Sequence, residues 1–81
     1  MGTIYVIKGI RIFLHYREHN PPHIHAIYAE YEVELIIKDG QLLEGEMPKA
    51  QLREIRNWLS APGVKEKLTS MFHKLNPHLR K

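Results

Sequence analysis

The sequence predicts a small two-layer α+β domain, an antiparallel β-meander of four to five strands with two C-terminal helices packed on one face. Three observations support this fold class. β-branched and aromatic residues recur in extended, alternating patterns from about residue 3 to residue 44. Two apolar stripes with helical spacing follow, at about residues 48–60 and 63–75. Strands followed by helices, with one apolar sheet face, place the helices over that face.

The length and composition limit the class of protein. At 81 residues the chain is expected to form a single domain, residues 1–81, with a thin core. The absence of cysteine excludes disulfides and thiolate metal ligands, and it favours a reducing, cytoplasmic setting. The apolar runs are too short to cross a bilayer and no signal peptide opens the chain, so neither insertion nor export is expected. The net charge of +3 divides into −1 over residues 1–40 and +4 over residues 41–81.

The strand pattern is clearest just after Lys8-Gly9, which indicates a turn or bulge. The face expected in the core carries Ile10, Ile12, Leu14 and Tyr16. The opposite face carries Arg11, Phe13, His15 and Arg17. Pro21 and Pro22 then interrupt the extended pattern, because proline lacks a backbone donor and has a fixed φ.

Residues 23–28 and 31–37 predict a hairpin around a tight turn at Ala29-Glu30. In this register Ala26 faces Val33 on the apolar side, and His25 faces Glu34 on the polar side. Asp39-Gly40 predicts a type I′ turn that brings residues 41–44 back along the preceding strand.

The helical half begins at Pro48, a residue that suits the first turn of a helix. Leu52, Ile55 and Leu59 then define an apolar stripe, with Trp58 expected in the core beside it. Pro62-Gly63 separates this helix from the second. The tail, residues 76–81, is expected to fray.

Histidines dominate the sheet face away from the helices, which we expect to stay open. His23 and His25 lie on one strand face about 6.5–7 Å apart, a spacing that allows joint ligation of one ion. A carboxylate from Glu34 or Glu18 would complete a site for a divalent metal such as zinc. The candidate metal ligands are His15, His19, His23 and His25.

The same residues support two other interpretations. In a ribonuclease-like interpretation, His23 and His25 would be general base and acid, and Arg11 or Arg17 would stabilise the phosphorane. In a purely structural interpretation, His25 pairs with Glu34 across the strands and the other histidines are solvated. The sequence leaves these alternatives open.

Several segments together resemble one bacterial family. They are Gly9-Ile10-Arg11-Ile12, the block from Glu18 to Ala26 with its His-x-Pro-Pro-His-x-His motif, Leu43 to Pro48, and Trp58. Over roughly residues 1–60 the chain is similar to the domain of unknown function 4160 family. The resemblance implies a bacterial cytoplasmic protein in a gene arrangement like that of toxin–antitoxin pairs. It implies His19, Pro21, Pro22, His23 and His25 as motif positions and assigns them no roles.

We therefore expect a small partner-binding module of toxin–antitoxin type that uses the His-rich sheet face. The expected partner is a small protein or a nucleic acid, not a membrane, and the chain is expected to form a homodimer. The expected binding residues are His15, Arg17, His19, Pro21, Pro22 and Glu34.

Overall fold

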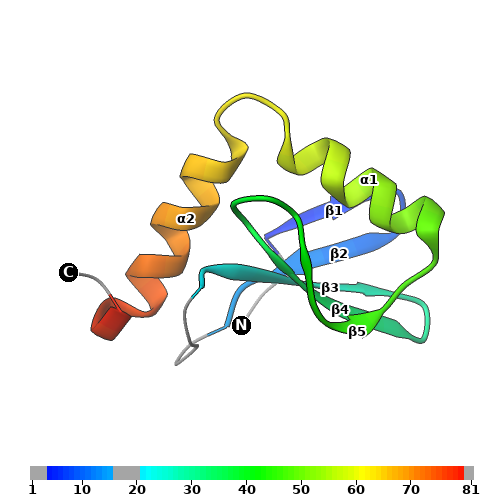
Figure 1. Ribbon diagram of the computed structural model, residues 1–81, viewed down its shortest axis with the longest axis horizontal. Helices are drawn as coiled ribbons and strands as arrows, with labels where there is room; N and C mark the ends of the chain where they lie inside the picture. Colours follow the sequence, from blue (N-terminus) through cyan, green and yellow to red (C-terminus); the bar gives the residue numbers. More distant parts are fainter. Residues whose placement is uncertain (1–3, 16–20, 80–81) are drawn as a thin grey trace.

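The computed structural model describes residues 4–15 and 21–79, and it contains one antiparallel sheet in these ranges (Figure 1). The strands are β1 (Tyr5–Ile7), β2 (Ile10–Phe13), β3 (His23–Tyr28), β4 (Tyr31–Ile36) and β5 (Leu42–Glu46). They lie in the order β1-β2-β3-β4-β5, so each strand pairs with its neighbour in sequence. This arrangement confirms the predicted β-meander.

Two helices follow the sheet, α1 (Lys49–Leu59) and α2 (Val64–Leu75), and a short 3-10 turn, η1 (Pro77–Leu79), comes after them. In Figure 1, α1 lies across the sheet, whereas α2 descends beside the end at which β3 begins. Asn76, the first residue of the tail that the sequence predicts to fray, is fully buried, and η1 follows it. None of the helices in the described ranges is long and apolar enough to cross a membrane.

Strand parity places the core where the alternation predicts it. Ile10, Ile12 and Leu14 are fully buried, whereas Arg11, on the opposite face, is exposed. Tyr16 and Arg17 lie outside the described residues. The helices contribute Ile55 and Leu59 from α1 and Leu68 and Phe72 from α2. Burial of such apolar side chains, about 1.5–3 kcal/mol each, holds the two layers together.

The β3–β4 hairpin has the predicted register. Tyr28 pairs with Tyr31, so a two-residue turn at Ala29-Glu30 joins the strands, and His25 pairs with Glu34. The alternation of apolar and polar residues and the length of the turn specify the same pairing, so the register was predictable.

The predicted type I′ turn at Asp39-Gly40 is wrong, since only Gly40 of the pair has a positive φ. The type I′ signature of two positive φ values occurs instead at Lys8-Gly9, between β1 and β2. The loop after β4 is longer because Ile37 enters the core and its N–H donates to the Pro22 carbonyl at 3.1 Å. Arg56 of α1 donates from Nε to the Gly40 carbonyl at 2.9 Å and ties the loop to the helix.

The polar face of the sheet is not open at its centre, which corrects the sequence prediction. His23 and His25 project to that face, yet they are only 4% and 5% exposed. Phe13 of β2, Glu34 of β4 and Phe72 of α2 lie around the two rings, so the first four residues of β3 are buried on both faces of the sheet. The exposed positions of this face lie toward the edges, at Arg11 and Glu32.

Candidate metal centre

His23 occupies the first position of β3, directly after the two prolines. Its Nδ1 lies 2.8 Å from the carbonyl oxygen of Pro21. A carbonyl oxygen only accepts hydrogen bonds, so Nδ1 carries the proton, and in the neutral ring Nε2 presents a lone pair. A hydrogen bond of this kind is what fixes the tautomer of metal-ligating histidines. Nε2 lies 3.7 Å from Oε1 of Glu34.

His25 and Glu34 face each other across β3 and β4. Nδ1 of His25 lies 3.9 Å from Oε2 of Glu34, whose side chain is 30% exposed. One ligand atom from each of His23, His25 and Glu34 lies within 4.8 Å of the other two. Two buried imidazoles and one partly solvated carboxylate therefore converge on a single point.

These separations suit a metal ion better than direct ion pairs. Both N···O distances exceed the roughly 2.7–3.2 Å of a hydrogen bond. Ligands bonded at about 2.0–2.2 Å to a tetrahedral ion lie about 3.4 Å from one another. Since the three ligand atoms lie within 4.8 Å of one another, small side-chain rotations would bring His23, His25 and Glu34 onto one ion.

Aromatic side chains hold the two imidazoles in place. The His15 ring stacks on His25 with centroids 4.0 Å apart and planes 21° apart, and Phe13 stacks on the same ring at 5.7 Å. On the other side of the cluster, Phe72 of α2 lies 5.5 Å from the His23 ring. Such packing restricts the rotation of both ligands, and the site is preorganised by residues distant in sequence.

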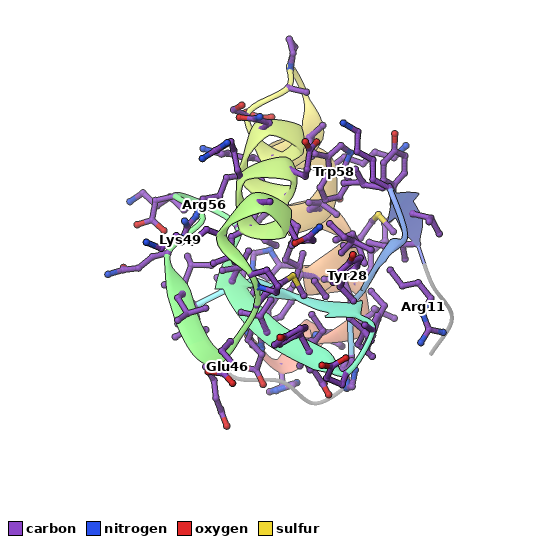
Figure 2. The ribbon with its side chains drawn as sticks, turned by 90° about the vertical axis from the view of Figure 1, so that its right-hand side faces the viewer. Arg11, Tyr28, Glu46, Lys49, Arg56 and Trp58 are labelled. Carbon is purple, nitrogen blue, oxygen red and sulfur yellow. The ribbon has the colours of Figure 1, made fainter. Side chains whose placement is uncertain are left out.

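The predicted site residues divide into those the structure brings together and those it does not. His23, His25 and Glu34 converge, whereas His15 is not in the ligand group and packs its ring face against His25. Pro21 contributes its carbonyl. Arg11 is exposed and projects outward at the side of the molecule (Figure 2). Arg17, Glu18 and His19 lie outside the described residues.

Sequence reasoning missed one supporting residue, Asn76, which caps the end of α2. Asn76 donates from Nδ2 to the carbonyls of His15 and Phe72, at 3.1 and 2.9 Å. It thereby fastens the end of α2 to the segment that follows β2, next to the histidines. The available signal was its position between an apolar helical stripe and Pro77, where an asparagine commonly ends a helix.

The fold and the cluster define a class: a small α+β domain with a buried pair of histidines and a carboxylate at the centre of its sheet. The chain belongs to the family described as Domain of unknown function (DUF4160), whose model matches residues 9–69. The matched segment includes every member of the cluster. No curated protein and no solved structure matches the chain.

Proposed function

We propose that this domain binds a divalent metal ion through His23, His25 and Glu34. The observation that carries the proposal is the convergence of three ligand atoms within 4.8 Å, two of them on buried rings. The Pro21 carbonyl supports it, because it leaves Nε2 of His23 in the form that ligates metal.

Zinc is the ion that best suits this donor set. Two imidazoles and one carboxylate are a recurrent set of three protein ligands for zinc, with a water molecule in the fourth position. Calcium and magnesium prefer all-oxygen surroundings with more ligands, so two nitrogen donors disfavour them. The partly exposed carboxylate of Glu34 gives the ion a route in from solvent.

Thermal unfolding of protein purified without a histidine tag tests the proposal. Zinc at 100 times its Kd should stabilise the fold by about 2.7 kcal/mol, which for a domain of this size raises Tm by at least about 10 °C. His25→Ala should remove this shift. His73→Ala is the matched control, since His73 is outside the cluster, and it should keep the shift. An unchanged Tm in millimolar zinc would exclude the metal site.

The partner-binding interpretation is supported by a different region, the free edge of the sheet. β5 is exposed along its whole length, with Leu42 and Leu43 each 44% exposed. An unpaired edge strand offers a row of backbone donors and acceptors that a partner strand can join. We therefore propose β5, and not the buried histidines, as the surface for a protein partner of toxin–antitoxin type.

The family resemblance suggests a partner encoded by a neighbouring gene, and complex formation with the product of that gene tests the second proposal. In size-exclusion chromatography of the co-expressed pair, Leu42→Lys with Leu43→Lys should abolish the complex. Tyr5→Lys with Val6→Lys is the control, because these residues are exposed on the opposite edge strand, β1. A complex that survives the β5 change but not the β1 change would overturn the assignment.

The RNase-like alternative has less support. General acid–base catalysis requires both imidazoles to reach the reacting phosphodiester. The rings of His23 and His25 are buried, and Arg11 projects outward from the sheet (Figure 2). The arrangement favours ligation of a small ion over contact with an RNA backbone.

A further inference from the structure

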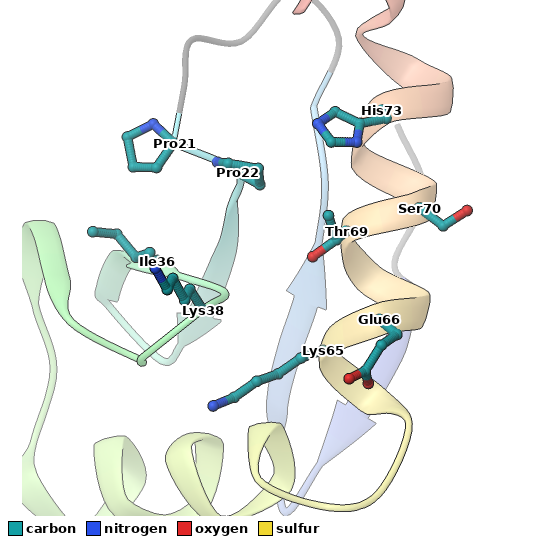
Figure 3. A pocket seen from close by; sticks show the side chains of 9 residues that line it. All are labelled: Pro21, Pro22, Ile36, Lys38, Lys65, Glu66, Thr69, Ser70 and His73. Atoms are coloured by element: carbon teal, nitrogen blue, oxygen red, sulfur yellow. The ribbon is translucent and has the colours of Figure 1, made fainter. Parts of the chain in front are cut away.

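A groove of about 680 Å³ separates α2 from the start of β3 and the end of β4 (Figure 3). Its strand side is formed by Pro21, Pro22, Ile36 and Lys38. Its helix side is formed by Lys65, Glu66, Thr69, Ser70 and His73. In Figure 3, Lys65, Thr69 and His73 project from α2 toward the gap, whereas Ser70 points away from it. The metal proposal uses none of these side chains.

Both walls of the groove are held by the fold. Pro21 and Pro22 have fixed φ angles, and the Pro22 carbonyl accepts the Ile37 N–H at 3.1 Å. On the helix side, Leu68 and Phe72 are buried in the core and anchor the turns that carry Thr69 and His73. The groove is therefore preformed, which lowers the entropic cost of binding a ligand.

The middle of the groove is apolar. It consists of the two proline rings and the Ile36 side chain, and it faces Thr69, whose hydroxyl points toward the gap (Figure 3). Proline has no N–H, so the strand wall offers few hydrogen-bond donors. The volume of the whole groove falls within the roughly 300–1,000 Å³ typical of small-molecule sites. A ligand in this part of the groove would bury apolar surface and would form few hydrogen bonds with the protein.

The groove carries positive charge on both sides. Lys38 lies in the loop after β4 and Lys65 in the first turn of α2, and Figure 3 shows Lys65 extending across the gap from the helix. Within residues 4–15 and 21–79 neither lysine forms an ion pair, whereas Lys8 does so with Glu54 at 3.3 Å. Glu66, the acidic residue of the lining, is exposed. An anionic group would complement the two ammonium groups.

From these features we infer that the groove binds a small amphipathic anion, a carboxylate on a medium-length hydrocarbon chain. The carboxylate lies between the ammonium groups of Lys38 and Lys65. The hydrocarbon chain lies against Pro22, Ile36 and Thr69. This inference is independent of the metal centre.

Isothermal titration of the full chain with decanoate, in the presence of a chelator, tests the inference. Decanoate should bind at one site at least tenfold more tightly than decyltrimethylammonium, which has the same chain length and the opposite charge. Lys38→Glu with Lys65→Glu should weaken decanoate binding at least tenfold. Lys67→Glu is the matched control on the same helix, outside the groove lining, and should leave the affinity unchanged.

Thr69→Trp provides a test that does not depend on charge, because the larger side chain fills the apolar middle of the groove. It should abolish decanoate binding while circular dichroism shows the fold retained. The inference is overturned if the cation binds as well as the anion, if the lysine variants bind normally, or if decanoate does not saturate. His25→Ala should leave decanoate binding intact, so failure of the zinc proposal and failure of this one are distinguishable.

Discussion

At the scale of single residues, the site depends on the orientation of a few polar atoms. The Pro21 carbonyl accepts a hydrogen bond from Nδ1 of His23 and so leaves Nε2 of that ring to face the cluster. Of the three cluster residues, Glu34 is the partly exposed one. The role of Glu34 can be tested by a substitution that preserves side-chain size.

Glu34→Gln should weaken zinc binding at least tenfold while the fold is retained. The amide has nearly the shape of the carboxylate but lacks its charge, and a neutral amide oxygen is a poor zinc ligand. Calorimetric titration with zinc measures the change. Glu46→Gln removes the same charge from the neighbouring strand, β5, and should bind zinc like the parent protein. Equal affinity for both variants would exclude Glu34 as a ligand.

Asn76→Ala should reduce the free energy of unfolding by about 1–3 kcal/mol. The substitution leaves the carbonyls of His15 and Phe72 without the amide that bonds them in a buried place. Urea denaturation gives the value. Asn57→Ala, at an exposed position of α1, should change stability by less than about 0.5 kcal/mol. A cost no larger than that of Asn57→Ala would show that Asn76 does not fasten α2 to the sheet.

At the scale of elements, β5 requires a glycine at the position paired with Val33 of β4. Gly45 has a φ of +86°, and a Cβ there would collide with the Glu32 backbone carbonyl. The strand also carries an irregular register opposite Glu34 and Leu35. Two constraints therefore act on Gly45, its positive φ and the closeness of the Glu32 carbonyl. Gly63 separates them, because it has only the positive φ.

Gly45→Ala should destabilise the protein more than Gly63→Ala does. Gly63 has a φ of +82°, but a Cβ there would meet nothing within 4 Å, so alanine incurs only the backbone strain. Gly45→Ala adds the collision, and we expect its cost to exceed that of Gly63→Ala by more than about 1 kcal/mol. Urea midpoints of the two variants provide the comparison. Similar costs would mean that β5 shifts easily to accommodate the side chain.

At the scale of the whole molecule, burial is greatest at the centre of the meander and falls toward its edges. β3 carries a run of four buried residues from its first position, whereas every residue of β5 is exposed. α2 adds to this gradient because Phe72 contacts the His23 ring at the start of β3.

Native-state hydrogen exchange should follow this gradient. Amides of β3 should exchange near the global unfolding free energy, because opening the central strand breaks two ladders and exposes both layers. Amides of β1 and β5 should exchange through smaller openings. Zinc should further slow exchange in β3 and β4, which carry the ligands. Equal protection across the five strands would contradict this order.

The hairpin register and the second-strand parity were predictable because both depend on local information. Alternation has a period of two, so the choice of turn at Ala29-Glu30 determines every pair up to His25 and Glu34. The convergence of those two residues could therefore be inferred before any coordinates. The type I′ turn at Asp39-Gly40 failed because Ile37, buried in the core, lengthens the loop.

Which residues share a face follows from the sequence alone: His23 and His25 lie on one side of β3, and Glu34 faces His25. The closure of this face at its centre, the orientation of one ring by Pro21 and the groove beside α2 follow from how the chain packs. The physical reason is that parity depends on the backbone of one strand. Burial and ring orientation depend on Phe13 of β2, on His15 just after it and on Phe72 of α2, which chain folding brings together.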